Sequence, residues 1–148
     1  MSELSLKTAS LIVDAALERG RALGLAPLTV VVLDIGGHLK VAKREDGSSL
    51  LRSEIATGKA WGVLGMGFGG RELARRAARA PQFFTALTEL AAGRMVAAAG
   101  GVLIRNAAGD IIGAIGISGD LSEKDEACAV AGIAAAGLVA DTGGEDPR

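Results

Sequence analysis

The sequence contains one histidine, and its position gives that residue a wide range of possible chemistry. His38 directly follows Gly36-Gly37, between two runs of residues typical of β-strands. An imidazole titrates near neutral pH and ligates iron when neutral, so His38 could be a general base or an iron ligand. A polar residue after two glycines is also typical of a simple hairpin turn. These three interpretations remain open at the level of the residue itself.

A second candidate for acid-base chemistry is Lys59, within "EIATGKA". It lies four residues after Ile55, so on a helix both side chains share one face and Lys59 could project into buried space. A buried lysine with a lowered pKa can act as a base or form a Schiff base. Alternatively, such a lysine pairs with a carboxylate or extends along apolar surface. Lys59 and His38 are therefore the candidate catalytic residues.

Arginines are the candidates for binding acidic groups. Arg44 closes a predicted strand, where its guanidinium could hold a carboxylate through two parallel hydrogen bonds or simply lie in solvent. Arg71, Arg75 and Arg79 recur every four residues with Arg76 beside them, which predicts a charged helix face in solvent or an anion-binding surface. Among these arginines, Arg44 is the predicted ligand-binding residue.

Glycines and aromatic side chains supply the other candidates for ligand binding. Bare backbone amides at the ends of a second predicted hairpin could cradle a carboxylate or an oxyanion, although turn geometry also explains them. Phe83 and Phe84 could line a pocket for a flat ligand, yet their helical spacing with later leucines places at least one in the core. The hairpin candidates are Gly100, Gly101, Ser118 and Gly119.

Composition argues against several classes of protein. The 148 residues suit one domain, residues 1–148, and 16 basic against 17 acidic side chains give a net charge of -1, which offers no electrostatic reason for a nucleic-acid or membrane partner. One cysteine and one histidine cannot build a cysteine/histidine zinc site. The longest apolar run, 127–140, is too short to cross a bilayer and predicts a packed helix. The N-terminal residues lack signal-peptide features, so we expect a cytoplasmic protein.

The order of predicted elements indicates how the candidate residues are held. Periodicity and turn signals predict a helix, a hairpin, three helices, a second hairpin and a final helix with a capping box at Ser122 and Asp125. This order favours an α+β fold, in which helices cover an antiparallel sheet in a single two-layer domain. Gly58, Gly62 and Gly65 form a stripe where another backbone could lie close. The predicted ranges are 4–24, 28–34, 39–44, 50–65, 71–79, 81–90, 100–106, 111–119 and from 122 onward.

Five segments carry a family resemblance, in the order "VVLDIGGHLKVAKREDG", "EIATGKA", "PQFFTAL", the glycine pair of "AAAGGVLIRN", and "GAIGISGDLSEKDEACAVAGI". Together they resemble the GlcG/HbpS-like family, which includes the C-terminal domain of PduO-type enzymes, over about residues 5–140. The resemblance implies a five-stranded antiparallel sheet flanked by helices, self-assembly into homo-oligomers and, in several members, haem binding or slow haem degradation. Other relatives are enzymes, including a lyase that acts on hydroxylaminobenzoate. The family often has proline at position 99 and tyrosine at position 61, where this chain has Ala99 and Trp61.

These observations lead to two functional hypotheses and a plainer alternative. In the first, a homo-oligomer binds haem or another flat molecule with carboxylates, with His38 as the iron ligand and Arg44, Lys59 or backbone amides orienting the acidic groups. In the second, a cofactor-free lyase or isomerase acts on a small aromatic or hydroxy acid, with Lys59 or His38 as acid and base and Arg44 holding the carboxylate. In the third, the oligomer is structural, and packed protein fills the space near Lys59 and Gly101. Whether the protein is an enzyme stays open.

Overall fold

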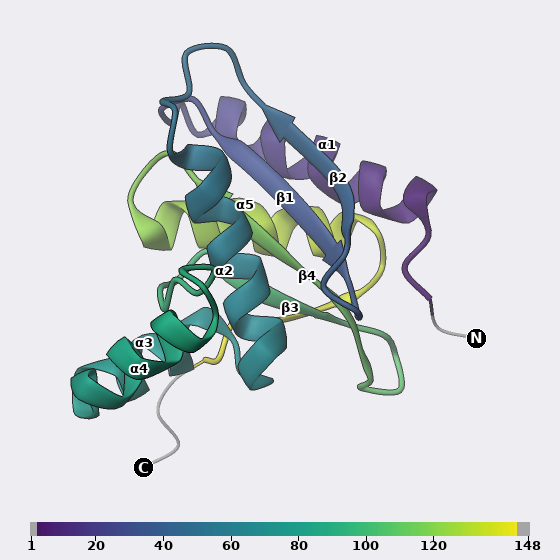
Figure 1. Ribbon diagram of the computed structural model, residues 1–148. Helices are drawn as coiled ribbons and strands as arrows, with labels where there is room; N and C mark the ends of the chain where they lie inside the picture. The colour runs from purple at the N-terminus through teal and green to yellow at the C-terminus, as the bar shows by residue number, and fades with distance from the viewer. Residues whose placement is uncertain (1–2, 145–148) are drawn as a thin grey trace.

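The computed structural model describes residues 3–144, at the centre of which lies a five-stranded sheet (Figure 1). The strands lie in the order β2-β1-β4-β3-β5, and every neighbouring pair is antiparallel. Both predicted hairpins and the α+β class are confirmed, and β1 pairs with β4 to join the hairpins. The strands are β1 (Thr29–Asp34), β2 (Leu39–Arg44), β3 (Gly101–Arg105), β4 (Ile111–Ser118) and β5 (Val139–Asp141).

Helices lie on both faces of the sheet. On one face α1 (Leu6–Ala22) packs beside α5 (Ser122–Ala135), and α2 (Arg52–Met66) crosses the other face over β1, β4 and β3. Two further helices, α3 (Gly70–Arg79) and α4 (Pro81–Leu90), project from the α2 side, at the lower left of Figure 1. The sheet is therefore the middle of three layers, one layer more than the sequence analysis expected.

The second helical layer follows from the residues of the central strands. β1 is buried along nearly its whole length, without the polar alternation of a strand that has one solvated face. Val30 and Val32 pack in the core on the α1–α5 side, whereas Val31 and Leu33 pack in the core beneath α2. Successive side chains of a strand point to opposite faces, so one apolar run serves two cores.

The fifth strand departs from the predicted elements. The apolar run 127–140 was expected to form one helix, but α5 ends at Ala135 and Val139 begins β5. Gly137, with a φ of 72°, adopts the left-handed conformation that commonly ends a helix. The chain then turns back so that Val139 pairs with Arg105 at the edge of the sheet. The helix prediction is therefore wrong at the end of this run.

The glycine stripe of α2 has a partner at two of its three positions. A Cβ on Gly58 would lie 2.7 Å from Val96 Cγ2, and one on Gly62 would lie 3.0 Å from Met95 Cγ. The backbone N–H of Val96 also donates to the Gly58 carbonyl at 3.1 Å. Gly65 faces only the edge of the Trp61 ring, at 4.0 Å. The expected close approach of another backbone therefore involves the first two glycines and the segment 94–96.

Among residues 3–144, no helix is both long and apolar enough to cross a membrane. The cytoplasmic location expected from the N-terminal residues stays a prediction.

Candidate functional site

The turn between β1 and β2 is organised by one carboxylate, that of Asp34. Its Oδ1 atom accepts hydrogen bonds from the backbone N–H groups of Gly36 at 2.9 Å and His38 at 3.0 Å. Gly37 adopts a φ of 81°, which glycine allows without strain, and its N–H donates to the Asp34 carbonyl at 2.9 Å. A side chain that bonds to backbone two residues further on is a common way to fix a turn.

The same carboxylate also holds the imidazole. His38 Nδ1 lies 3.3 Å from Asp34 Oδ1, and the histidine side chain is 82% exposed. Gly36 leaves room for the ring, because a Cβ there would lie 2.8 Å from Nδ1. Within residues 3–144, the Nε2 atom has no hydrogen-bond partner. A carboxylate on one ring nitrogen with the other nitrogen open is the usual arrangement of a metal-ligating histidine.

Electrostatics keep this carboxylate charged. Burial alone would raise the pKa of Asp34, but the hydrogen bonds from the backbone N–H groups of His38 and Gly36, together with the nearby His38 side chain, outweigh it, so the pKa lies below its usual value. An ionised Asp34 favours the tautomer that carries its proton on Nδ1. The lone pair of His38 Nε2 is then directed away from Asp34 and available to a ligand.

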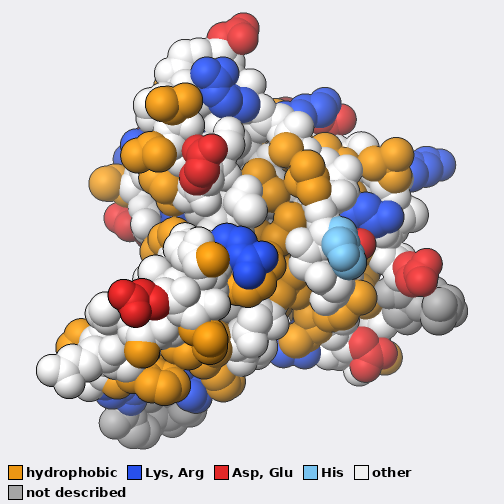
Figure 2. All heavy atoms as spheres, viewed as in Figure 1, with side chains coloured by type: hydrophobic (Ala, Val, Ile, Leu, Met, Phe, Trp, Pro, Cys, Tyr) orange, Lys and Arg blue, Asp and Glu red, His pale blue; other side chains and the backbone are white. Residues whose placement is uncertain are grey.

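A cavity of about 400 Å³ opens beside this turn. Its volume falls in the range of small-molecule sites. Apolar side chains form part of the wall, and Lys40 contributes a cation. Figure 2 shows hydrophobic side chains gathered next to the pale blue histidine, where Ile35 and Leu39 are both more than half exposed. The cavity is lined by Glu3, Leu4, Asp34, Ile35, Gly36, His38, Lys40 and Ile112.

Lys59 lies in a different environment, inside the protein. It is 3% exposed, and its Nζ donates to the Ile117 carbonyl at 2.9 Å and to Asp125 Oδ2 at 3.2 Å. Burial lowers the pKa of Lys59, an effect that Asp125 partly offsets, and burial likewise raises the pKa of Asp125. Asp125 was predicted to complete a capping box, but α5 has no side-chain cap at its N-terminus. The Asp125 carboxylate instead binds Lys59 and the backbone N–H of Asp120.

The structure brings the glycine-rich candidates to Lys59. Gly100 accepts a backbone hydrogen bond from Ile117 at 3.0 Å, and its missing Cβ leaves room for the lysine, since that atom would lie 2.9 Å from Nζ. A Cβ on Gly101 would lie 2.6 Å from the Lys59 carbonyl. Ser118 is fully buried and accepts from the Arg52 guanidinium at 3.0 Å. Neighbouring protein atoms therefore fill the space beside Gly100, Gly101 and Ser118.

The remaining candidates, Gly119, Phe83 and Phe84, have other contacts. A Cβ on Gly119 would clash with the Pro27 carbonyl, so this glycine permits close backbone packing at the turn before β1. Phe84 belongs to the core beneath α2, which confirms that at least one of the two phenylalanines is a core residue, while Phe83 is 57% exposed. Phe84 also lines a cavity of about 270 Å³ that shares no residue with the cavity at His38.

Arg44 and His38 lie at opposite ends of β2. Six residues of extended strand span about 20 Å, which is too far for one small ligand to contact both side chains of a single chain. Arg44 lines a separate cavity of about 400 Å³ together with Arg21, Pro27, Glu45 and Asp46. A joint role for Arg44 and His38 therefore requires two copies of the chain.

Besides Asp125, sequence reasoning missed three partners of the candidate residues. Asp34 carries a recognisable signal, because an aspartate two residues before a glycine pair is typical of a turn fixed by its own side chain. Arg52 carries no such signal, because its contact with Ser118 forms only when α2 packs on β4. Trp61, noted only as a departure from the family pattern, packs against the histidine turn, where a Cβ on Gly37 would lie 3.2 Å from the indole Nε1.

Comparisons with known proteins find a matching family and several similar structures. A family model described as "Haem degrading protein HbpS-like" matches residues 4–134. A structure titled "Crystal Structure of PduOC:Heme Complex" is 30% identical with a TM-score of 0.83, and the match covers 93% of this chain and 98% of that one. A structure of HbpS is 31% identical with a TM-score of 0.77, covering 90% of each chain. The protein ORFY of Klebsiella pneumoniae, 22% identical with a TM-score of 0.81 over 93% of each chain, shares the fold. No curated protein matches the sequence.

Proposed function

This chain belongs to the HbpS-like family, and from that premise we propose that it binds haem, with His38 as the protein ligand to the iron. The observation that carries the proposal is the Asp34–His38 pair, whose open Nε2 lies beside a cavity of about 400 Å³. The family description names haem, and the PduOC structure is titled as a haem complex. The same site would also suit other flat molecules that carry carboxylates.

The residues around the cavity suit such a ligand. A porphyrin supplies four nitrogen ligands of its own, so one protein nitrogen is enough, and no group of three metal-ligating side chains occurs among residues 3–144. Ile35 and Ile112 offer apolar surface to a flat ring, and Lys40 offers a cation to its carboxylates. Bound haem would supply a redox-active iron. We propose slow degradation of the bound haem as a second, more specific activity of the same site.

Haem titration tests the proposed ligand. We expect the wild-type chain to give a Soret band that is lost, or needs at least tenfold more haem, in His38→Ala. Asp34→Asn keeps an acceptor for the turn but removes the charge that orients the imidazole, so we expect about 10- to 100-fold weaker binding. Absorbance titration and competition with apomyoglobin would measure both effects.

The matched control is Lys43→Ala, because Lys43 lies on the same strand as Lys40 but bonds to Asp14 of α1 at 2.6 Å. Its haem affinity should equal that of the wild type. A Soret band of normal position and affinity in His38→Ala would remove the ligand role.

Self-assembly is a further part of the proposal. Among the helices and strands of residues 3–144, α4 packs chiefly against α3, and its Phe83 and Leu90 side chains are both more than half exposed. Apolar surface of this kind often lies in an interface. We expect light scattering to give a mass that is a multiple of 14.8 kDa, and a lower multiple for Phe83→Glu with Leu90→Glu. A wild-type mass of 14.8 kDa at micromolar concentration would contradict self-assembly.

The alternative is a cofactor-free lyase or isomerase, and one observation favours it. Burial lowers the pKa of Lys59, which increases the share of neutral amine that a base requires. Against it, the Nζ of Lys59 is already engaged by Ile117 and Asp125 inside the protein. Haem binding therefore has better support. Release of ammonia from hydroxylaminobenzoate that disappears in Lys59→Met would favour the lyase.

A further inference from the structure

A third cavity of about 400 Å³ lies at the beginning of α3, on a part of the molecule that the proposed haem site does not use. The turn before α3 and the segment that follows β5 form its walls. Three arginines and two carboxylates line it, which leaves one positive charge in excess. The lining residues are Gly67, Phe68, Gly69, Glu72, Arg75, Arg76, Arg105, Asp141 and Gly143.

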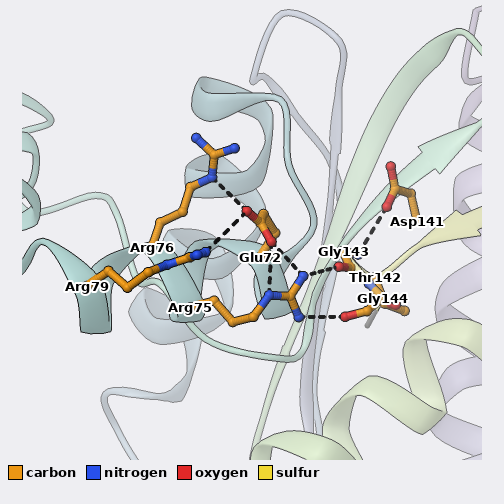
Figure 3. Close-up of polar contacts among 8 residues, drawn as sticks. All are labelled: Glu72, Arg75, Arg76, Arg79, Asp141, Thr142, Gly143 and Gly144. Carbon is orange, nitrogen blue, oxygen red and sulfur yellow. Dashed lines mark hydrogen bonds and ion pairs between the residues drawn. The ribbon is translucent and has the colours of Figure 1, made fainter. Parts of the chain in front are cut away.

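One carboxylate fixes the arginines of α3 in place. Glu72 Oε1 accepts from Arg75 Nε at 2.9 Å, and Glu72 Oε2 accepts from Arg76 Nε at 2.8 Å (Figure 3). These hydrogen bonds lower the pKa of Glu72, so the carboxylate stays ionised at neutral pH. The two guanidinium groups are therefore held in defined positions before any ligand arrives.

All three nitrogens of the Arg75 guanidinium bond to the protein itself. Besides its bonds to Glu72, its terminal nitrogens donate to the carbonyls of Gly143 and Gly144, each at 2.6 Å. These bonds attach the segment after β5 to α3, which the Arg71 N–H reinforces by donating to the Thr142 carbonyl at 3.0 Å. The role of Arg75 is therefore structural.

Arg76 differs from Arg75, because only its Nε is engaged. Its guanidinium carbon lies 3.9 Å from the centroid of the Phe68 ring, and within residues 3–144 its two terminal nitrogens have no hydrogen-bond acceptor. Figure 3 shows these nitrogens turned away from Glu72. A stacked guanidinium with two open donors is well suited to a planar or tetrahedral oxyanion.

Arg105 supplies a second open donor at the same cavity. Its Nε donates to Asp141 at 2.9 Å and one terminal nitrogen donates to the Gly109 carbonyl at 2.7 Å, which leaves the other terminal nitrogen without an acceptor in the described part of the chain. Asp141 and Gly109 thus anchor this side chain from two sides. We propose that the cavity at the start of α3 binds an oxyanion group, a phosphate ester or a carboxylate, through Arg76 with Arg105 as the second cation.

Binding of inorganic phosphate to the wild-type chain tests this site. At constant ionic strength, phosphate should raise the melting temperature and give saturable heat in calorimetry. Arg76→Gln should weaken phosphate binding at least tenfold, and Arg105→Gln should weaken it less. Titrations with glycerol phosphate and with acetate identify which oxyanion the site binds. A site for phosphate esters prefers glycerol phosphate, and a site for carboxylates prefers acetate.

The matched control is Arg94→Gln. Arg94 is also stacked on an aromatic ring, with its guanidinium carbon 4.1 Å from the Trp61 centroid, but it lies outside this cavity. This variant should bind phosphate like the wild type. Equal phosphate affinity in Arg76→Gln, with its fold verified by circular dichroism, would overturn the proposal, as would the absence of wild-type binding to both phosphate and acetate. Because Arg76 and His38 line different cavities, haem titration of Arg76→Gln should be unchanged whichever result is obtained.

Discussion

Replacing Lys59 with alanine is expected to lower the free energy of unfolding by about 3–5 kcal/mol, because it leaves the Asp125 carboxylate buried without its cation. Both partners are almost completely buried, and the lysine also satisfies the Ile117 carbonyl. Nζ also occupies the space beside Gly100, where a Cβ would lie 2.9 Å from it, so its removal leaves a cavity there. Urea denaturation followed by circular dichroism would measure the change.

Two comparisons separate the loss of the cation from the loss of volume. The double variant Lys59→Met with Asp125→Leu removes both charges and should recover most of the lost stability, since well-packed apolar pairs often replace buried ion pairs without cost. Lys43→Ala removes an exposed partner of Asp14 and should cost less than about 1 kcal/mol. A Lys59→Ala protein as stable as Lys43→Ala would contradict a buried ion pair between Lys59 and Asp125.

Gly116→Ala should destabilise the protein by about 3 kcal/mol, at the upper end of what overpacking usually costs. Gly116 lies in the middle of β4, directly beneath α2, and a Cβ there would overlap the Ala56 carbonyl oxygen. That oxygen belongs to the helix backbone, so relief requires α2 to move away from the sheet. Thermal and urea unfolding of the variant would measure the effect.

The same substitution at Gly65 should have the opposite sign. Gly65 lies within α2, where a Cβ would meet only the Trp61 ring at 4.0 Å, and alanine favours a helix over glycine by about 0.5–1 kcal/mol. Gly65→Ala is therefore expected to stabilise the chain slightly. If both variants shifted stability equally, the close contact between α2 and β4 would be in error.

The hairpins could be predicted from the sequence because their signals are local. "LTVVVLD" and "LKVAKR" on either side of Gly36-Gly37 specify strands and a turn without reference to the rest of the chain. The family resemblance correctly implied a fifth strand, but its position could not be predicted from residue patterns, since Val139–Asp141 forms a strand only where β3 offers a free edge. The second helical layer was missed for a related reason: the run at Val30–Leu33 is compatible with one buried face or two, and the packing of α2 decides between them.

The candidate site shows the same division between local and tertiary information. His38 was selected because it is the only histidine, and its partner Asp34 is four residues away on the same turn. Lys59 was selected from helical spacing, but its partner Asp125 is 66 residues further along the chain and is brought to it by the pairing of β4 with its neighbours. Arg44 and His38 lie at the two ends of the strand predicted at 39–44, so the sequence pattern already implies the separation that β2 imposes on them.

Anomalous diffraction at the iron edge from crystals of the haem-loaded protein would test the central claim most directly. We expect the iron peak within coordination distance of His38 Nε2, with Asp34 still bonded to Nδ1 and the porphyrin against Ile35. An iron peak beside any other side chain, with the imidazole of His38 left in solvent, would contradict the assignment of the β1–β2 turn as the haem site.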